Sequence, residues 1–364
     1  MSKIRLKDIT SFDKGKQING DKLISDGKYD YLNGGTKPSG KWNEYNTNGN
    51  TIAVSEGGNS CGYVNFMNNP FWCGAHCYYL YDIKCNIKYL YYALKSQQDR
   101  IMKLRSGACM PNIKKSDLGN FLFEYNQNPD DQAKTVYNLD RLTLVINLCE
   151  VITKKLDTLV KSRFVEMFGD PVSNPMNWNK VAIGKHCHII TGNTPPRANE
   201  ENYGSFIEWI KSDNINTPDT FLTKAGEYLS EKGASIGRCV ESGSILMTCI
   251  AGSINCIGNV GVANRKVAFN QQINAIVPKF DETMYIYWLM ILSKPYIQST
   301  INMSLKGILS KGQLSVMDFP FPPLNLQRQF ADFVEQTDKS KLAVKQILEK
   351  AETLKKSLMQ EYFG

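Results

Sequence analysis

Two long stretches of the chain, residues 131–168 and 326–363, contain no proline or glycine and carry apolar residues at alternating three- and four-residue steps. Such spacing places one narrow apolar stripe along a helix, as in the seam of a coiled coil. The seam positions are Val136, Leu139, Ile146, Cys149, Leu156, Val160 and Met167 in the first stretch and Phe330, Val334, Val344, Leu348, Ala351 and Leu358 in the second. We therefore predict two long helices.

The two predicted helices are copies of one another. TLVKSRFVEMFG (158–169) and TLKKSLMQEYFG (353–364) agree at seven of twelve positions, and the same offset of 195 residues relates Gln132 to Gln327. A constant offset without gaps indicates an internal repeat. Two copies of one helix can pair antiparallel, which predicts a pseudo-twofold molecule.

The chain is thus predicted to be organised as domain, helix, domain, helix. The predicted boundaries are 1–126, 127–170, 171–325 and 326–364. Within the two domains, runs of β-branched and aromatic residues bounded by Gly or Asn predict strands at 51–58, 71–81, 244–252 and 271–278. Helices are predicted at matching places, 88–104 and 283–297. The expected fold class is α+β, with two β-rich domains separated by two long antiparallel coiled-coil helices.

The two domains also resemble each other weakly. The stretch from Leu6 to Gly15 is similar to that from Ile183 to Gly192, at an offset of 177 residues. Long polar loops at 33–50, 191–204 and 211–220 are rich in Gly, Asn and Lys. Loops of this composition do not form a core and are free to carry specificity.

The charge of the chain is moderately basic, with a formal net charge of +8. Residues 1–126 carry 17 basic and 11 acidic residues, and residues 171–325 carry 13 and 11. This excess permits a nucleic-acid surface without requiring one. The charged N-terminus lacks a signal-peptide core, and the longest apolar run, 284–292, is far shorter than the roughly 20 residues of a membrane span. We expect a soluble, cytoplasmic protein with no membrane partner.

The ten cysteines are scattered, and several lie in apolar runs. CGAHC (73–77) could form a zinc site with Cys61 and Cys85, but its spacing matches no common zinc motif. HCH (186–188) lacks a third ligand nearby. Core packing of reduced thiols is therefore favoured over metal binding.

Catalytic motifs are not recognisable in the sequence. It contains no nucleophile elbow, phosphate-binding loop or dinucleotide fingerprint. NPFW (69–72) is similar to the Asn-Pro-Pro-aromatic loop of amino-methylating enzymes, but Phe71 replaces the second proline. PDDQAK (129–134) is similar to a metal-nuclease pattern, although Asp130 and Asp131 are better explained as a helix cap and dipole partners. We predict no catalytic residue and no bound metal in this chain.

Over essentially its whole length, the sequence resembles the specificity subunit of type I restriction–modification systems. The resemblance lies in the duplicated helices that begin near Gln132 and Gln327, and in three further segments: ITGNTPP (190–196), FVEMFGDPVSNPMNW (164–178) and SLKGILSKGQLSVMDFPFPPLNLQ (304–327). The first repeat departs from this pattern, because FLFEYNQNPDDQ (121–132) lacks the Pro-Pro-Leu lead-in. The first helix is therefore expected to begin differently.

The resemblance implies that each domain recognises one half of a bipartite target in double-stranded DNA. It also implies that the helices separate the halves and dock two N6-adenine methyltransferase subunits, and that restriction subunits join the complex. No cofactor is expected in this chain, because S-adenosylmethionine, ATP and Mg would belong to the partner subunits.

Base edges are read by Asn, Gln, Lys and Arg side chains, and phosphates by Lys and backbone amides. On position, the candidate DNA-binding residues of the first domain are Asn33, Lys37, Lys41, Asn43, Glu56 and Asn59. Those of the second are Asn193, Arg197, Lys211, Asp213, Asn214, Asn255 and Lys306. Lys37 is expected to contact phosphate and Asn214 a base.

Two alternatives to a DNA-specificity subunit stay open. In one, the chain is a scaffold whose domains bind proteins, so that its binding would be insensitive to salt. In the other, it is a self-contained DNA methylase or nuclease, which would be active as the purified chain alone.

Overall fold

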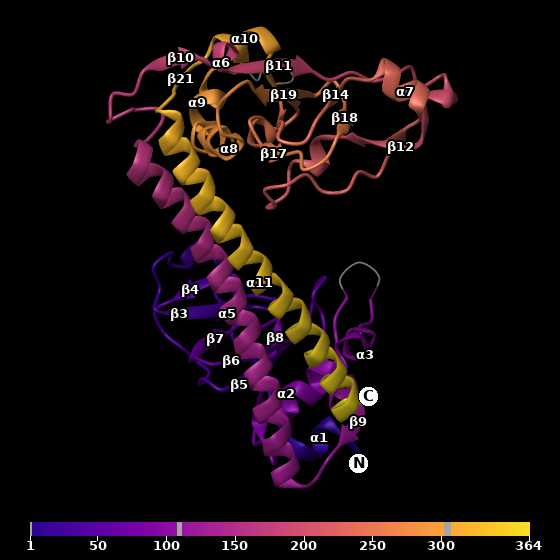
Figure 1. Ribbon diagram of the computed structural model, residues 1–364. Coiled ribbons are helices and arrows are strands. Elements are labelled where there is room, and N and C mark those ends of the chain that lie inside the picture. Colours follow the sequence, from indigo (N-terminus) through magenta and orange to yellow (C-terminus); the bar gives the residue numbers. More distant parts are fainter. Residues whose placement is uncertain (1, 108–110, 302–306) are drawn as a thin grey trace. The chain divides into compact units, whose positions relative to one another are not determined.

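The computed structural model describes residues 2–107, 111–301 and 307–364, and the chain forms two compact units (Figure 1). Unit 1 consists of Met1–Val151 and Lys345–Gly364, and unit 2 of Ile152–Val344. The two long helices, α5 (Pro129–Phe168) and α11 (Leu324–Phe363), each contribute a segment to both units. Each unit therefore contains part of both repeats of the long helix.

The two long helices begin and end at equivalent positions, 195 residues apart. The expectation that the first begins differently is therefore wrong, although its lead-in sequence does differ. Asn128 caps α5, since its Oδ1 accepts a hydrogen bond from the backbone N–H of Asp130 at 2.8 Å. Asp130 and Asp131 lie in the first turn, where negative charge is favourable, and do not themselves act as the cap.

The predicted seam is confirmed, because every one of its thirteen positions is buried or half-buried. In unit 2 the rings of Phe164 and Phe330 lie 5.3 Å apart, and Lys341 binds Asp157 at 2.7 Å. These pairs show that α5 and α11 run antiparallel. In unit 1, Asn138 donates a hydrogen bond to the hydroxyl of Tyr362 at 3.0 Å, in agreement with that direction.

Unit 1 contains a four-stranded antiparallel sheet and a three-stranded sheet. The first has the strand order β2 (Ser11–Lys14), β8 (Cys77–Tyr81), β5 (Thr51–Ser55) and β6 (Val64–Met67). The second has the order β4 (Gly40–Trp42), β3 (Tyr29–Leu32) and β7 (Phe71–Cys73), with β3 and β7 parallel. A separate pair joins β1 (Ser2–Arg5) to β9 (Leu122–Tyr125).

Unit 2 repeats this topology. Its first sheet has the order β11 (Cys187–Thr191), β19 (Ile273–Pro278), β15 (Ile245–Thr248) and β17 (Val260–Val262). Its second has the order β13 (Tyr228–Leu229), β12 (Tyr203–Ile210), β18 (Val267–Phe269) and β14 (Cys239–Val240). Two further strand pairs complete unit 2. They join β10 (Lys180–Ala182) to β21 (Asp318–Pro320) and β16 (Ile250–Ala251) to β20 (Gly307–Ile308). The repeat thus extends from the helices to both domains.

The short helices also occur in equivalent pairs. In unit 1 they are α1 (Leu6–Ile9), α2 (Ile87–Ser96), α3 (Gln98–Met102) and α4 (Lys115–Gly119), with a 3-10 turn at Gly20–Lys22. In unit 2 they are α6 (Ile183–His186), α8 (Thr283–Leu292), α9 (Lys294–Ser299) and α10 (Lys311–Val316), with α7 (Glu231–Ile236) in addition. Unit 2 also has 3-10 turns at Glu200–Asn202, Ser212–Asn214 and Ile254–Cys256.

Each predicted short helix is in fact two. The segment 88–104 breaks at Gln97 and the segment 283–297 at Ser293. The predicted strand 71–81 likewise divides into β7 and β8 around residues 74–76, and 244–252 divides into β15 and β16. The positions of these elements were predicted correctly, and their internal breaks were not.

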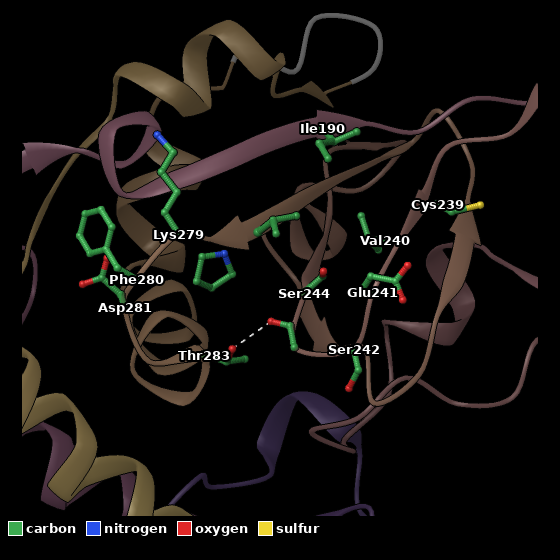
Figure 2. A pocket seen from close by; sticks show the side chains of 13 residues that line it. Ile190, Cys239, Val240, Glu241, Ser242, Ser244, Lys279, Phe280, Asp281 and Thr283 are labelled. Atoms are coloured by element: carbon green, nitrogen blue, oxygen red, sulfur yellow. Dashed lines mark hydrogen bonds between the residues drawn. The ribbon is translucent and has the colours of Figure 1, made fainter.

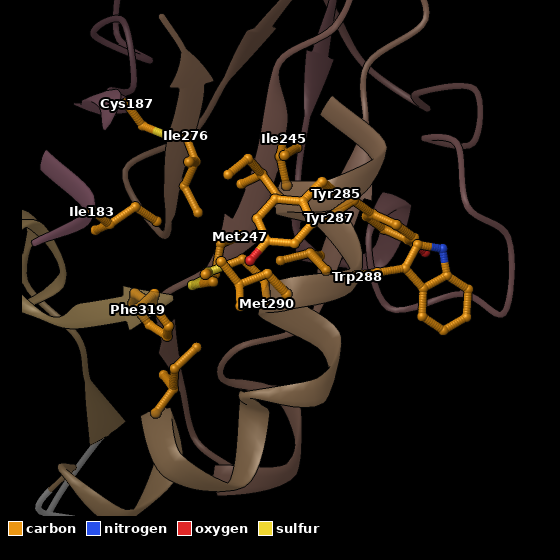
Figure 3. Close-up of a cluster of buried hydrophobic side chains, with 14 of the residues drawn as sticks. Ile183, Cys187, Ile245, Met247, Ile276, Tyr285, Tyr287, Trp288, Met290 and Phe319 are labelled. Atoms are coloured by element: carbon orange, nitrogen blue, oxygen red, sulfur yellow. The ribbon is translucent and has the colours of Figure 1, made fainter. Parts of the chain in front are cut away.

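Each unit has its own hydrophobic core. In unit 2, α8 directs Tyr285 and Met290 toward the side chains of the β11–β19–β15–β17 sheet, among them Ile245 and Ile276 (Figure 3). The Tyr285 ring also stacks on Phe164 of α5 at 5.5 Å, so that the core joins the sheet to the long helix. Burial of such aromatic side chains is the main stabilising contribution in a domain of this size.

A buried glutamine connects the start of each long helix to an earlier short helix of the same unit, α2 in unit 1 and α8 in unit 2. The Oε1 atom of Gln132 accepts a hydrogen bond from the N–H of Asn86, the N-cap of α2, at 3.0 Å. Gln327 does the same for Glu282, the N-cap of α8, at 3.1 Å. The repeated glutamines noted in the sequence therefore have the same structural role in both units.

The sequence similarity at Gly15 and Gly192 also has a structural cause. A Cβ atom at Gly15 would lie 1.9 Å from the carbonyl oxygen of Cys73, and one at Gly192 would lie 2.1 Å from that of Asn270. No side chain fits at such distances, so only glycine allows the chain to pass this close to its neighbour.

Among the described residues, no helix is long and apolar enough to cross a membrane. Nor do those residues include a group of three or more His, Cys, Asp or Glu side chains arranged to hold a metal ion. The nine cysteines in the described part of the chain are reduced thiols, while Cys109 lies outside it.

Candidate nucleic-acid interface

Three loops of unit 1 meet where β3, β5 and β7 end, at residues 33–39, 56–60 and 74–76. We call them the unit 1 loop surface. The Oδ1 atom of Asn33 accepts a hydrogen bond from the N–H of His76 at 3.1 Å, and the N–H of Glu56 donates to the carbonyl of His76 at 2.9 Å. The Ser55 hydroxyl donates to the carbonyl of Gly35 at 2.8 Å. The loops thus hold one another in place.

The predicted site residues of this surface fall into two groups. Lys37 and Asn59 are exposed, as a DNA contact requires. Asn33 is used to join two loops, and Glu56 is only 8% exposed. The Glu56 carboxylate accepts a hydrogen bond from Lys14 at 2.8 Å. The structure thus adds Lys14, a cation paired with Glu56, beside these loops.

Lys41 and Asn43 are exposed but lie elsewhere in unit 1. Lys41 belongs to β4, the edge strand beside β3, where it faces Asp30, and Asn43 follows the same strand. Both are nearer the start of β3, whereas Asn33 follows its end. The structure therefore does not bring them into the unit 1 loop surface.

In unit 2, the loops at residues 211–214 and 270–272 follow β12 and β18, the counterparts of β3 and β7. With the loops at residues 192–197 and 236–238 they form what we call the unit 2 loop surface. Asn193 connects two of them, since its side-chain amide donates to the carbonyl of Ile236 at 3.0 Å and its Oδ1 accepts from the N–H of Arg238 at 2.8 Å. The hydroxyl of Thr194 donates to the Oε1 of Gln271.

Arg197 and Lys211 meet at one carboxylate on this surface. Arg197 forms a two-point ion pair with Glu227, with N–O distances of 3.2 and 2.9 Å, and the Lys211 ammonium lies 2.6 Å from the same group. Both cations lie over the ring of Trp209, at 5.2 Å from its centre in each case. Hydrogen bonds first from Arg197 and then from Lys211 lower the pKa of Glu227 to about 2, so the carboxylate stays ionised near neutral pH.

The remaining predicted residues of unit 2 differ in their surroundings. Asp213 is exposed, but Asn214 is only 7% exposed and its side chain binds the N–H of Lys211 and the carbonyl of Lys224. Asn255 is exposed in a separate loop, where its carbonyl accepts from Lys294 at 2.7 Å. Lys306 lies outside the described residues.

Sequence reasoning missed Glu227 and Arg238. Glu227 lies 30 residues from Arg197 and 16 from Lys211, and no local motif joins the three. Arg238 is exposed and donates to the carbonyl of Thr191 at 2.6 Å. Its position after the polar segment 231–237 was the only available signal, and composition alone does not distinguish it from other surface arginines.

Unit 2 also has a cavity of about 460 Å³ beside β14 and the loop before α8 (Figure 2). The charged side chains that line it already have partners. Asp281 binds His186 at 2.8 Å, and Lys279 donates to the carbonyls of Gly184 and Lys185. Glu241 binds Lys266 at 2.7 Å. These polar groups therefore serve the fold itself.

Apolar side chains on the outer faces of the long helices form another candidate surface. Four of them are equivalent by the repeat: Ile152 and Ile347 are 41% and 50% exposed, and Leu159 and Leu354 are 48% and 51% exposed. Further exposed apolar residues on these helices are Tyr137, Leu144, Val145, Leu148, Val151, Val165 and Leu342. These positions are candidates for contact with partner proteins, because contiguous exposed apolar side chains are typical of protein-binding surfaces.

Comparison with known proteins gives the family. The model of the type I restriction modification DNA specificity domain matches residues 1–158 and 175–353, which is most of the chain. The chain belongs to this family. The matched segments correspond to the two repeats of the specificity domain, one for each predicted domain and most of the helix that follows it.

Relatives of this specificity-domain chain include proteins named as type I specificity subunits in two mycoplasmas. The one from Mycoplasma genitalium is 35% identical over 185 residues, which are 49% of this chain and 47% of that protein. The one from Mycoplasma pneumoniae is 33% identical over 247 residues, 62% of this chain and 63% of that protein. The chain thus spans between about half and two thirds of the length of these curated relatives.

Solved structures with the same fold come from type I restriction–modification systems. The crystal structure of an S subunit from M. genitalium matches all of this specificity-domain chain and 96% of that one, with a TM-score of 0.71 and 21% identity. A second solved chain comes from a structure concerned with complex assembly and conformational transition of the type I system. It matches 99% of the present chain and 96% of its own length, with a TM-score of 0.58 and 14% identity. The predicted fold class is confirmed.

Proposed function

We propose that this chain is a non-catalytic specificity subunit that recognises a bipartite target in double-stranded DNA and positions adenine methyltransferase subunits on it. The observation that carries the proposal is the duplicated loop surface. Two units with the same order of strands in their four-stranded first sheets, in a chain of the DNA specificity domain family, each have exposed polar and basic loops after the equivalent strands β3 and β12, and β7 and β18.

The two loop surfaces differ in sequence, as recognition of two different half-sites requires. Unit 1 offers Lys37 and Asn59, and unit 2 offers Arg197, Lys211 and Asp213. A good two-point contact to a base contributes about 1–3 kcal/mol of discrimination. Two units that each read a few base pairs combine their discrimination and leave the intervening bases unread. Lys41, Asn43, Asn255 and Lys306 stay predictions for this role.

The long helices support the docking of two copies of one partner. Ile152 with Ile347 and Leu159 with Leu354 place the same apolar side chains at equivalent positions. A partner that binds this pattern on one helix finds it again on the other. We assign the two positions to methyltransferase subunits, and restriction subunits would join the resulting complex.

The chemistry would belong to the partners. The methyltransferase subunits would bind S-adenosylmethionine and extrude the target adenine from the base stack, because the reaction cannot proceed inside a duplex. ATP and Mg would be bound by the restriction subunits. The present chain would act in the cytoplasm, where it would supply the position on the DNA and no reacting group.

The proposal is tested by expressing the chain with the type I methyltransferase subunit of the same genome in a host that lacks the system, then mapping methylated adenines. The expected result is one split motif, methylated on both strands, that disappears when the methyltransferase is expressed alone. Methylation that does not depend on the chain, with no complex between the two proteins, would favour the protein-binding scaffold. Activity of the purified chain alone on DNA would favour the self-contained enzyme.

A further inference from the structure

The ion pairs of Arg197 and Lys211 differ from the ion pair of Arg265, which also lies in unit 2. Arg265 binds Glu208 at 2.6 and 2.7 Å and also donates to the carbonyls of Leu222 and Thr223. Within the described residues, the cationic groups of Arg197 and Lys211 form hydrogen bonds and ion pairs with Glu227 alone. Arg265 is therefore built into the fold, whereas the other two cations depend on one carboxylate.

This carboxylate is accessible to a competing anion. The side chains of Arg197, Lys211 and Glu227 are 56%, 36% and 37% exposed. Ion pairs at this exposure contribute little to stability, because water screens the charges, so an incoming anion can displace Glu227 at little cost. The phosphate group suits this position, because it accepts the same two-point contact from a guanidinium that a carboxylate does.

The cations would keep their positions when Glu227 leaves. The Arg197 guanidinium lies 4.8 Å from the centre of the Tyr203 ring and 5.2 Å from that of Trp209, and Lys211 shares the Trp209 ring. Trp209 is 3% exposed, which fixes its ring as a support. The negative face of an aromatic ring attracts a cation, so the two rings hold both side chains in place.

We propose that Glu227 occupies, in the free chain, the position of a DNA phosphate on Arg197 and Lys211, and thereby weakens the sequence-independent part of DNA binding. This inference rests on the proposed function, since it supposes that the unit 2 loop surface meets DNA. Two cations and one carboxylate leave a local charge of +1 for the DNA backbone. Without the carboxylate both cations would be free to contact phosphates.

The test compares Glu227→Gln with Glu241→Gln in the full-length chain, bound to its methyltransferase subunits where they co-purify. Glu241, labelled in Figure 2, is 71% exposed. It binds Lys266, so the control removes the same charge from another ion pair of unit 2. Binding of a labelled duplex of random sequence is measured between about 0.05 and 0.2 M salt. Glu227→Gln should bind several-fold tighter than the wild type, with a salt dependence steeper by about 1–2 in the log–log slope, since each added phosphate contact contributes about 0.9.

The outcomes separate this inference from the proposed function. If the wild type binds duplex DNA but Glu227→Gln behaves like Glu241→Gln, the role of Glu227 is refuted and the specificity function stands. If the wild type binds no duplex, the proposed function fails and this inference with it. If Glu227→Gln does not fold, the same measurement is made with Glu227→Asp and its control Glu241→Asp. The shorter carboxylate cannot hold both cations, so Glu227→Asp should bind DNA tighter than the wild type, by less than expected for Glu227→Gln.

Discussion

At the residue scale, the asparagines chosen for DNA contact divide into structural and accessible ones. Asn33, Asn193 and Asn214 use their side-chain amides to connect loops, while Asn43 and Asn59 are exposed. Loop asparagines satisfy backbone groups as readily as they reach a ligand, and composition does not separate the two uses. The sequence therefore located several polar loops, but it did not indicate which of their side chains are free.

Asn214→Ala tests this division. The substitution removes hydrogen bonds to Lys211 and Lys224 from a nearly buried position, and we expect it to lower the free energy of unfolding by about 1–3 kcal/mol. The exposed Asn43→Ala should change it by less than about 0.5 kcal/mol. Urea denaturation measures both. An unchanged stability together with an altered base preference would instead make Asn214 a reader of bases, as the sequence first indicated.

Lys95 gives unit 1 a stability that depends on pH. Burial, with a smaller contribution from the charge of Lys355, lowers the pKa of Lys95 to about 8. Its ammonium donates to the carbonyl of Val64 and lies over the ring of Tyr63. In the unfolded chain the pKa of Lys95 is about 10.4. Between about pH 8 and 10.4 the folded state therefore binds fewer protons than the unfolded state. Stability should therefore rise with pH from about 8 to about 10.5 on account of this group.

The comparison of Lys95→Met with the wild type isolates that contribution. The stability of the variant relative to the wild type should fall by on the order of 1 kcal/mol between pH 7 and pH 10, after allowance for solvent screening. Thermal or urea unfolding at the two pH values gives the difference. Lys22→Met, at an exposed position, should show no such change. A difference that is constant with pH for Lys95→Met would mean that its ammonium is not destabilised by folding.

At the element scale, the long helices were predictable because one period extends over their whole length and appears twice. The short helices were located correctly, but their division was not recognised. In the second, Pro295 was a usable signal, since proline is tolerated in the first turn of α9 and not inside a longer helix. In the first, no proline or glycine marks the break at Gln97, which depends on tertiary packing.

The repeated glutamines should be important for stability in both units. Gln132 is 3% exposed and Gln327 is 1% exposed, and replacement of either by alanine would leave the N–H of Asn86 or Glu282 without its acceptor. We expect each substitution to lower the free energy of unfolding by about 2 kcal/mol or more. The exposed Gln346→Ala is the matched control on α11. Equal and small effects for all three variants would show that the buried glutamines are not needed to connect the helices.

Exposed leucines at equivalent positions should each govern one docking position. Leu159→Lys and Leu354→Lys replace about half-exposed apolar side chains with a charge, so stability should change little while one methyltransferase subunit is lost in each case. The double variant should lose both. Mass photometry of the co-expressed complexes measures the stoichiometry. Val316→Lys, an exposed apolar position outside the long helices, should retain two subunits, and two subunits in the double variant would place the docking surface elsewhere.

At the scale of the whole molecule, the internal repeat proved more informative than any single motif. A faint similarity at Gly15 and Gly192, together with the duplicated helix, predicted that the second half of the chain repeats the first. The structure shows the same order of four strands in the first sheet of each unit, while the second sheet of unit 2 has one strand more than that of unit 1. What the sequence could not provide was the association of residues far apart in the chain, such as Glu227 with Arg197, because sequence separation hides contacts that only the fold creates.

The repeat also predicts that function is divided between the two domains. If each domain reads one half-site, the halves should be separable by exchange, since the core of each unit contains residues of one domain only, besides those of the long helices. The helices at 127–170 and 326–364 would be left unchanged, so that the docking positions and the separation of the half-sites are kept.

The most direct measurement is therefore an exchange of residues 171–325 for the corresponding region of another member of the family, followed by mapping of methylated adenines in cells that also produce the methyltransferase subunit. One half of the split motif should change to that of the donor, while the other half and the spacing remain. A motif in which both halves change, or neither, would contradict the assignment of one half-site to each domain.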